Sequence, residues 1–573
     1  MTKTLTAVLA LTAGLSLTTA ALAQEAPAQR TSTEWTRDSS RPRAPEQEAM
    51  RFDKADLAFR ILPETKSIEG VSTLDFTATA PLERLALDLD VRFDVSEVAI
   101  DGRALPRSAW TNPEGRMTIT LPRRLRAGQS VQVRVTYAGV PHPARNAPWD
   151  GGWVWRTAPS GEPWIATAVQ GDGCDMIWPC IDWPTAEPRR VDMHFTVPSN
   201  LAAPGPGRLT GKRDNGDGTT TWSWSAGQMN TYAVSINVGP FVEKTATYRS
   251  RFGNDIQMSY WHLRSDDPAK VDDLFAEFPL MLQFFEEVIG PYPFGDEKMG
   301  VVETPHLGME HQTLNAYGNQ YRKDHKGYDW LLHHELAHEW FGNQMTHGVL
   351  DDIWLHEGLG TYMQPLYLRW LHGDRLFQAE LMGQRLGLGN EHPIVSGRTI
   401  TDEETSVAGP GNDVYDKASL VAHTLRHLIG DDAFYRSLRL LIYGRDDPRP
   451  GNFEPRFAST REYMDIVNRV TGQDLDWFFE GYLYQAAIPD LVETREGDRL
   501  TLEWKTGNGA PFPLPVEVEV RGQVQTVPMT GGRGEITLPA GAHYVIDPYG
   551  KVLRQSDVVD EFEAWQAAQR RRN

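Results

Sequence analysis

The pattern of hydrophobic and polar positions divides the chain into three stretches. From residue 45 to 240 hydrophobic and polar residues alternate in short runs, such as residues 130–137 and 220–225, which turn-forming clusters separate. Alternation with a period of two predicts half-buried strands, so we expect an N-terminal β domain here. The alternation returns over residues 486–555, as in 514–520, and predicts a small C-terminal β-sandwich.

The stretch between these β regions, residues 241–485, has a helical period. After a short strand-rich beginning, apolar residues recur three and four positions apart, as in residues 271–289, 330–341 and 358–370. The tail, residues 556–573, is expected to add one short helix. The chain is therefore predicted to be a multidomain α+β protein whose middle domain is rich in helix.

The first 23 residues predict a secretory signal peptide. One lysine precedes an apolar run, and Ala21-Leu22-Ala23 forms a cleavage site before Gln24. The threonines in the run favour cleavage over an uncleaved membrane anchor, and no other apolar run reaches membrane-spanning length. Residues 24–44 are polar without periodicity and are expected to be a disordered linker. We therefore expect a mature protein without a stable membrane span, located outside the cytoplasm in a periplasm.

Charge and cysteine content narrow the choice further. The formal net charge is −20, which argues against nucleic acid or anionic membranes as partners. The only cysteines are Cys174 and Cys180. An oxidising compartment permits them to pair, but a sequence does not give the geometry that pairing requires, so a disulfide remains open. Neither cysteine lies in a nucleophile or zinc pattern.

Residues 330–343 contain the strongest chemical signal, the pentapeptide His334-Glu335-Leu336-Ala337-His338. The segment has no proline or glycine before Gly342-Asn343, which predicts a helix that stops there. Residues i and i+4 share one helix face, so His334 and His338 can bind the same ion. Neutral imidazole nitrogens suit Zn²⁺, and Glu335 can accept a proton from a water that the ion activates.

Glu357 is the expected third ligand. Eighteen residues separate it from His338, and it precedes the helical run 358–370, in which Pro365 is a potential kink. Catalytic zinc sites use three protein ligands and keep one position open. A single histidine would be interpreted as an ordinary core or surface residue, but this combination predicts a His₂Glu zinc site.

These residues resemble the aminopeptidase N family of zinc metallopeptidases, the gluzincins that include leukotriene hydrolase/aminopeptidase. The family shares the H-E-x-x-H pattern, the eighteen-residue gap and a glutamate in a W-L-x-E-G context. Further segments resemble family motifs in the family's order: Trp178-Pro179-Cys180-Ile181-Asp182, Tyr292-Pro293-Phe294, Leu307-Gly308-Met309-Glu310-His311, and Tyr415-Asp416-Lys417. The similarity spans about residues 45–550.

The resemblance implies a zinc-dependent aminopeptidase, a hydrolase that removes N-terminal residues from peptides with one zinc ion per chain. Glu335 would take a proton from the attacking water and pass it to the leaving amine. Tyr415 would stabilise the negative charge that develops on the carbonyl oxygen.

The resemblance also assigns the residues that hold the substrate's N-terminus. Glu310 would bind the free α-amino group, which is charged below its pKa of about 8. Met309 would touch the first side chain. Relatives add a polar side chain from the N-terminal domain, which Gln170 matches here, with Asp172 as the alternative.

The fold that the resemblance implies is a thermolysin-like zinc domain at residues 241–485, between the family's N-terminal β domain and a small β-sandwich. Larger relatives carry a C-terminal helical domain that covers the active site. The sequence stops after the β-sandwich and a short tail, so no helical cap domain is expected and the cleft should be more open.

Several positions depart from the family pattern. Leu307 and His311 replace a glycine and an asparagine, which leaves the pocket for the first side chain undefined, and His356 and Ala418 also differ. None of these changes removes a ligand, the base or the oxyanion donor. His333, His347 and His356 are expected to support the ligands or to lie at the surface.

Two other functions remain open. The altered pocket is compatible with a zinc hydrolase of another specificity, such as an endopeptidase or an epoxide hydrolase. A non-catalytic scaffold is disfavoured, because such proteins lose ligands or the base and this chain keeps them all.

Overall fold

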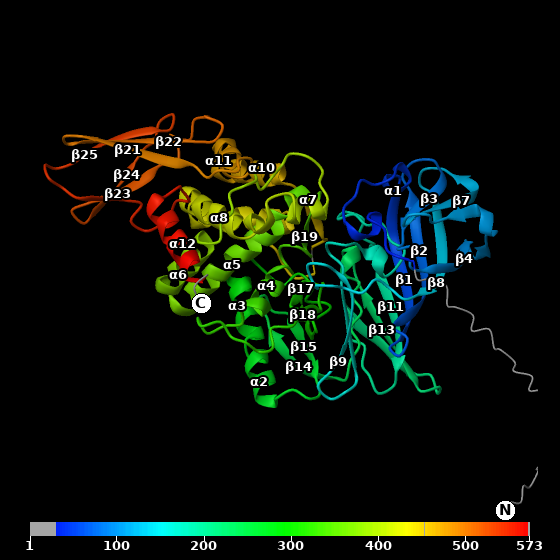
Figure 1. Ribbon diagram of the computed structural model, residues 1–573. Coiled ribbons are helices and arrows are strands. Elements are labelled where there is room, and N and C mark those ends of the chain that lie inside the picture. Colours follow the sequence, from blue (N-terminus) through cyan, green and yellow to red (C-terminus); the bar gives the residue numbers. More distant parts are fainter. Residues whose placement is uncertain (1–29, 452, 571–573) are drawn as a thin grey trace, which may run out of the picture.

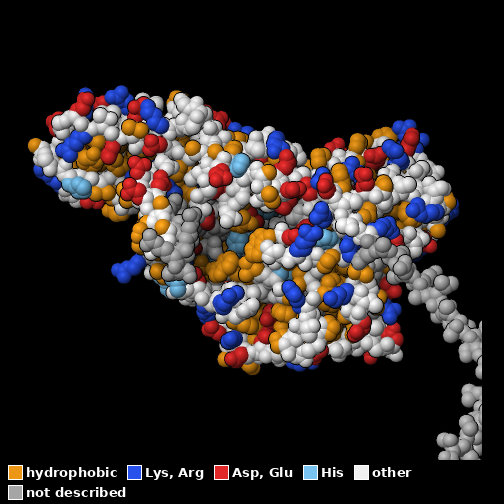
Figure 2. Space-filling view, in the orientation of Figure 1, with side chains coloured by type: hydrophobic (Ala, Val, Ile, Leu, Met, Phe, Trp, Pro, Cys, Tyr) orange, Lys and Arg blue, Asp and Glu red, His pale blue; other side chains and the backbone are white. Residues whose placement is uncertain are grey.

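The computed structural model describes residues 30–451 and 453–570, which form three lobes (Figure 1). The N-terminal β domain lies at one end, the helical middle domain at the centre, and the C-terminal strands at the other end. This arrangement confirms the predicted α+β organisation with β-rich regions on either side of a helical domain. Acidic and basic side chains are interspersed over the face shown in Figure 2, so the net negative charge is not gathered into one patch there.

An eight-stranded sheet forms the body of the N-terminal domain. In spatial order its strands are β12 (Arg208–Asp214), β13 (Thr219–Ala226), β11 (Val191–Pro198), β1 (Met50–Leu62), β2 (Ser67–Ala78), β8 (Ser130–Gly139), β4 (Asp94–Ile100) and β5 (Arg103–Ala104). Neighbouring strands are antiparallel except β1 and β11, which are parallel. Every second residue is buried along β8 and β13. This confirms the strands that were predicted at residues 130–137 and 220–225.

Two smaller sheets complete this domain. They consist of β3 (Leu82–Asp88), β7 (Arg116–Leu125) and β6 (Trp110–Thr111), and of the hairpin β9 (Gly152–Thr157) and β10 (Pro163–Ala168). Cys174 and Cys180 form a disulfide, with Cα atoms 6.3 Å apart. This pairing answers the question that the sequence left open.

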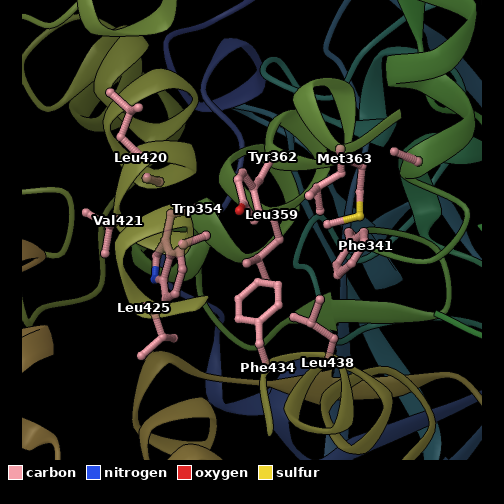
Figure 3. Close-up of a cluster of buried hydrophobic side chains, with 14 of the residues drawn as sticks. Phe341, Trp354, Leu359, Tyr362, Met363, Leu420, Val421, Leu425, Phe434 and Leu438 are labelled. Atoms are coloured by element: carbon pink, nitrogen blue, oxygen red, sulfur yellow. The ribbon is translucent and has the colours of Figure 1, made fainter. Parts of the chain in front are cut away.

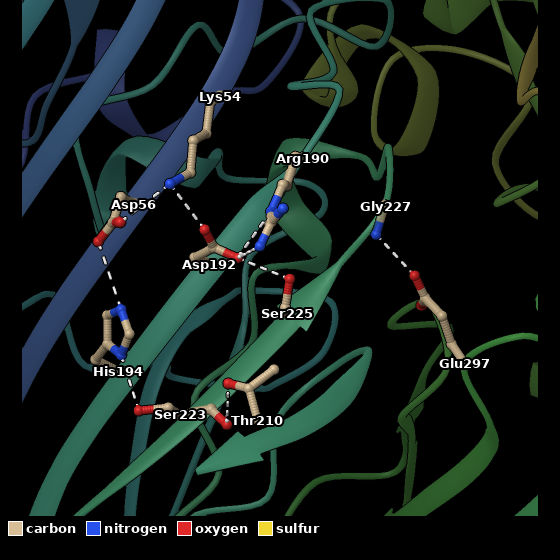
Figure 4. Close-up of polar contacts among 10 residues, drawn as sticks. All are labelled: Lys54, Asp56, Arg190, Asp192, His194, Thr210, Ser223, Ser225, Gly227 and Glu297. Atoms are coloured by element: carbon tan, nitrogen blue, oxygen red, sulfur yellow. Dashed lines mark hydrogen bonds and ion pairs between the residues drawn. The ribbon is translucent and has the colours of Figure 1, made fainter.

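Polar side chains join β1, β11 and β13 across one face of the large sheet (Figure 4). Lys54 Nζ lies 2.8 Å from Asp192 Oδ2. Ser225 Oγ donates a hydrogen bond to Asp192 Oδ1 at 2.7 Å. The amide of Gly227, just after β13, donates to Glu297 of the middle domain at 2.7 Å, so the end of this strand is held against that domain.

The structure differs from the sequence-based expectation for residues 30–44. The expected disordered linker is packed, with Ser32, Thr36, Ser39 and Ser40 buried. The amide of Ser39, for example, donates to the carbonyl of Gly171 at 2.9 Å. The composition is that of a disordered segment, but several of its polar groups bond to residues that are remote in sequence, as Ser32 does to Asp90.

The remaining predictions for the N-terminus concern residues 1–29, which lie outside the described residues. They include the signal peptide at 1–23. Within the part of the chain that the structure describes, no helix combines the length and hydrophobicity that a membrane crossing requires.

A five-stranded sheet opens the middle domain. Its strands, in spatial order, are β14 (Phe241–Arg249), β15 (Asp255–Leu263), β16 (Met299–Glu303), β18 (Asn315–Tyr317) and β17 (Gly308–Met309). A two-stranded sheet of β19 (Met345–His347) and β20 (Arg456–Ala458) lies elsewhere in the domain. The helices are α2 (Pro268–Phe275), α3 (Phe278–Val288), α4 (Trp330–Ala337), α5 (Trp354–His372), α6 (Asp374–Arg385), α7 (Asp402–Ser406), α8 (Asp416–Ile429), α9 (Asp431–Tyr443), α10 (Thr460–Thr471) and α11 (Asp476–Tyr482).

The helix predicted over residues 271–289 is divided into α2 and α3. Pro279 stands in the first turn of α3, where its missing N–H removes no helical bond. A continuous helix would place the same proline in its interior and lose a bond to residue 275. The break therefore follows from a residue that the apolar period alone does not reveal.

Helix α5 is the centre of the middle domain. It starts at Trp354, earlier than the run 358–370 predicted, and continues past Pro365 to Gly373, which ends it with a φ of 83°. Residues 354–368 are all buried. Its side chains, including Leu359, Tyr362 and Met363, pack in one cluster with Leu425 of α8 and Phe434 of α9 (Figure 3). This packing fixes the helix that carries Glu357.

The C-terminal lobe contains two three-stranded sheets. They are β21 (Asp490–Glu496), β22 (Arg499–Lys505) and β25 (Arg533–Thr537), and β24 (Gln523–Val527), β23 (Val516–Val520) and β26 (Tyr544–Ile546). Buried and half-buried residues alternate along β23, as predicted for residues 514–520. The expected terminal helix is α12 (Asp557–Arg570).

Candidate active site

Helix α4 carries the two histidines of the H-E-x-x-H pattern. Asp329 caps its N-terminus by accepting a hydrogen bond from the amide of Leu332 at 3.1 Å. The helix ends at Ala337, several residues before the predicted stop at Gly342. His338 nevertheless keeps helical backbone angles, with φ −67° and ψ −15°, so it still lies one turn after His334.

The three predicted ligands converge. His334 Nε2 and His338 Nε2 are 3.2 Å apart, and Glu357 Oε2 lies 3.5 and 3.4 Å from them respectively. His338 and Glu357 are buried. Glu357 stands in the first turn of α5, so two separate helices supply the set.

The donor atoms fit a zinc ion. The carbonyl of Phe341 lies 2.9 Å from His338 Nδ1 and accepts its proton, which leaves the Nε2 lone pair free for a metal. Glu357 Oε2 is buried and has no hydrogen-bond partner within the described residues. Two facing imidazole nitrogens and an unpaired carboxylate oxygen, all within 4.8 Å, form the His₂Glu set that suits catalytic Zn²⁺.

Glu335 and Tyr415 face the same space as the ligands. Burial raises the pKa of the Glu335 carboxyl well above its usual value, and the carboxylates of Glu310 and Glu357 raise it further. Tyr415 joins a 3₁₀ turn to α8, and its ring centre is 6.1 Å from that of His334. Burial, followed by the same carboxylates and Glu335, raises the pKa of the Tyr415 phenol, so it remains a proton donor.

Glu310 follows β17 and accepts two hydrogen bonds from the N-terminal domain on one oxygen. Gln170 Nε2 and the Tyr232 hydroxyl both donate to Oε1, at 2.5 and 2.6 Å. Ligand atoms of Glu310, Glu335 and His338 all lie within 4.8 Å of one another. A carboxylate is therefore held beside the ligand set by residues of two domains.

The structure also places the remaining candidates. Gln170 lines the cleft, as does Met309 of β17. Asp172, the alternative to Gln170, does not line the cleft and accepts a hydrogen bond from the amide of Gly151. Tyr232 was not predicted from the sequence, because a single tyrosine in an irregular segment has no pattern that marks it.

The three nearby histidines are buried rather than at the surface. His333 stacks on Phe285 and Tyr367, with ring centres 5.2 and 4.6 Å apart, and belongs to the core. His356 Nε2 accepts a hydrogen bond from the amide of His347 at 3.0 Å, which ties α5 to β19 beside Glu357.

A cleft of about 650 Å³ is lined by the three ligands together with Glu335, Tyr415, Glu310, Gln170 and Met309. The N-terminal domain contributes Trp149 and Gln170 to its wall, and the middle domain contributes α4, α5 and the loop that contains Val407. Trp149 and Val407 are largely exposed. Of the described residues, none of the C-terminal sandwich lines the cleft. The site therefore lies between the first two domains.

The fold and the His₂Glu set resemble those of zinc metallopeptidases. Residues 281–482 match the Peptidase family M1 domain. The matched region lies within the middle domain and includes all three predicted zinc ligands, Glu335 and Tyr415.

Relatives with described functions are distant. Leucine aminopeptidase 2 of Ajellomyces capsulatus is 23% identical over 83% of this chain and 77% of its own length. Human aminopeptidase B is 23% identical over 79% of this chain and 67% of its own length. Other relatives are longer: the match covers 45% of probable aminopeptidase 2 of Sulfurisphaera tokodaii, so the chain spans about half the length of several of these proteins.

A solved M1 zinc metallopeptidase from Deinococcus radiodurans shares the fold. It superimposes with a TM-score of 0.64 and is 24% identical, covering 78% of this chain and 98% of its own.

Proposed function

We propose that this chain is a zinc-dependent aminopeptidase that hydrolyses the N-terminal peptide bond of peptides. The observation that carries the proposal is the position of Glu310, a buried carboxylate within 4.8 Å of Glu335 and His338. A carboxylate at that distance from the reacting centre fits a substrate whose charged amine is only one residue from the scissile bond. The M1 relatives named aminopeptidases support this class.

Two protein donors prepare Glu310 for an ammonium ion. Gln170 and Tyr232 both donate to Oε1, so Oε2 is left for the substrate's α-amino group. A charge-assisted hydrogen bond to this amine fixes the register of the peptide, so the first peptide bond reaches the ligand set. Met309 beside it contacts the first side chain.

The reaction divides between the metal and two side chains. When bound by His334, His338 and Glu357, Zn²⁺ supplies an activated water and polarises the scissile carbonyl. Glu335 accepts a proton and delivers it to the leaving amine, a role that its raised pKa favours. Tyr415 donates a hydrogen bond to the carbonyl oxygen as negative charge develops there.

The proposal is tested with aminoacyl-arylamides whose amine is free or acetylated. We expect hydrolysis of the free-amine compounds, no hydrolysis after acetylation, and loss of activity in Glu335→Gln. Cleavage of internal bonds in acetylated peptides would instead indicate an endopeptidase. Zinc binding without any hydrolysis of amide or epoxide substrates would indicate a scaffold.

We also propose that the protein acts outside the cytoplasm, in a periplasm. The disulfide between Cys174 and Cys180 supports an oxidising compartment. Cell fractionation followed by N-terminal sequencing tests this: the mature protein should be periplasmic and begin at Gln24. Cytoplasmic protein that still begins at Met1 would contradict it.

A further inference from the structure

A second group of acidic side chains lies in the N-terminal domain, outside the peptidase cleft. It surrounds a small cavity of about 10 Å³, enough for roughly one water molecule or ion. The lining residues are Trp35, Arg41, Gln47, Asp88, Asp175 and Asp182. Three carboxylates therefore meet at one buried space that the peptidase chemistry does not use.

Asp175 is the unusual member of this group. Its exposure is 2%, and neither carboxylate oxygen has a hydrogen-bond partner in the described parts of the chain. Buried carboxylates are normally paired or bind a metal, because an unpaired one loses its hydration without compensation. Asp175 is thus poised for a partner that is not a protein group.

Asp182 points toward the same space. A Cβ atom placed on Gly173 would lie 2.4 Å from Asp175 Oδ1 and 2.8 Å from Asp182 Oδ2, so the two oxygens flank one position. Gly173 has a φ of 123°, a conformation that favours glycine. Asp175 lies inside the disulfide loop of Cys174 and Cys180, and Asp182 follows it.

The other lining groups hold the carboxylates in place without neutralising them. Gln47 Nε2 and the amide of Asp182 donate to Asp88 Oδ2, at 2.7 and 3.1 Å. Ser39 Oγ donates to Asp182 Oδ1 at 3.2 Å. The cation that lines the cavity, Arg41, is paired with Asp38 at 3.0 Å.

The pKa values of these carboxyls also indicate that too little positive charge surrounds them. Burial raises the pKa of Asp175 well above its usual value, and the carboxylates of Asp182, Asp88 and Asp90 raise it further. Burial and Asp88 raise the pKa of Asp182 to about 8. Such a group needs either protons or a cation.

We propose that Asp88, Asp175 and Asp182 bind a calcium ion. Ca²⁺ takes six to eight oxygen ligands in flexible geometry, whereas Mg²⁺ requires a near-ideal octahedron and keeps its waters. The three aspartates are spaced more widely than the His334, His338 and Glu357 donor atoms, which all lie within 4.8 Å of one another, and this suits the larger ion.

The ion would stabilise the wall of the peptidase cleft. Asp182 is hydrogen-bonded to Ser39, whose amide donates to the carbonyl of Gly171 at 2.9 Å. Gly171 adjoins Gln170, which contacts Glu310. This consequence rests on the proposed aminopeptidase function, whereas binding of the ion does not.

Terbium luminescence tests the site directly, because Tb³⁺ replaces Ca²⁺ at oxygen ligands and Trp35 lines the cavity as an energy donor. Zinc-loaded wild-type protein should give sensitised Tb³⁺ emission that Ca²⁺ displaces, with one Ca²⁺ per chain in equilibrium dialysis. Asp175→Asn should reduce the Tb³⁺ affinity at least about tenfold, and Trp35→Phe should reduce the emission while leaving Ca²⁺ binding intact. The control Asp416→Asn removes a carboxylate of the peptidase cleft and should change neither.

Thermal unfolding provides the second measurement and requires no substrate. Wild-type protein in 1 mM Ca²⁺ should melt about 2–5 °C higher than in calcium-free buffer, and Asp175→Asn should not respond. If Asp175→Asn does not fold, the wild-type Ca²⁺ stoichiometry and Tm shift decide alone. Absence of bound Ca²⁺, or a Tm that rises on acidification but not with Ca²⁺, would mean that the carboxylates hold protons and would overturn the proposal. Neither result depends on whether arylamides are hydrolysed.

Discussion

The Tyr232 hydroxyl donates a 2.6 Å hydrogen bond to Glu310 Oε1 across the interface between the N-terminal and middle domains. Burial raises the pKa of this phenol, and Glu310 raises it further, so Tyr232 remains a neutral donor. The expected anchor for the substrate amine therefore depends on a residue of the other domain. Relative movement of the two domains would change the binding of the amine directly.

Tyr232→Phe is expected to weaken binding of free-amine substrates more than it slows the chemical step. A hydrogen bond to a charged group contributes about 1.5–3 kcal/mol, so KM should rise roughly 10–100-fold with a smaller change in kcat. Steady-state kinetics with aminoacyl-arylamides measures both. Tyr137→Phe removes another buried hydroxyl, one that donates to the carbonyl of Ile177, and should leave KM unchanged. An unaltered KM in Tyr232→Phe would contradict this role.

Two matched variants should distinguish loss of zinc binding from loss of the general base. Glu335→Gln is expected to retain zinc and to lower kcat by about 10²–10⁴-fold, because only the proton transfer is lost. Glu357→Gln removes a ligand and should lower zinc affinity by at least about 100-fold. Dialysis against a series of chelators of increasing zinc affinity, followed by metal analysis, distinguishes the two variants. Zinc loss in Glu335→Gln would place that carboxylate among the ligands instead.

Gly358 is required by the close approach of two helices. A Cβ at this position would lie 2.3 Å from Ala418 Cβ of α8 and 3.0 Å from the carbonyl of Val414. Gly358→Ala should therefore push α5 away from α8 and move the adjacent Glu357, which lowers zinc affinity and the melting temperature. In Gly383→Ala of α6 the new Cβ meets nothing within 4 Å, so this control should stabilise the protein by about 1 kcal/mol. Equal effects of the two variants would refute the packing argument.

Local patterns predicted what depends on neighbours in sequence. The period of two found β8 and β13, and the H-E-x-x-H spacing with Glu357 found the ligand set, because i and i+4 geometry is encoded locally. Tyr232 and the packed segment 30–44 were missed for the opposite reason. Their partners, Glu310 and Gly171 among them, lie more than 70 residues away, and no periodicity marks a polar group that is satisfied at that distance. The proposed calcium site was also not predicted from the sequence, because Asp88 is remote in sequence from Asp175 and Asp182.

Asp172 predicts a measurable pH dependence of stability. Burial, with a smaller contribution from the carboxylates of Asp150 and Asp38, raises its pKa to about 7, although the Gly151 amide and Arg37 act in the opposite direction. Asp402 of α7 also faces it. A carboxyl whose pKa is higher in the folded protein binds more protons there than in the unfolded chain. Its contribution is therefore most favourable below pH 4 and is lost progressively as the pH rises from 4 to 7.

Asp172→Asn should remove this dependence and keep an oxygen for the Gly151 amide. We expect the variant to match wild type near pH 4 and to exceed it by about 4 kcal/mol at pH 8, where the wild-type carboxylate is ionised. Denaturant unfolding at both pH values measures the difference. Asp498→Asn changes an exposed carboxylate and should follow wild type at each pH. If Asp172→Asn is instead less stable than wild type at pH 8, the ionised Asp172 carboxylate stabilises the folded protein. This result would contradict the destabilisation by burial that the raised pKa implies.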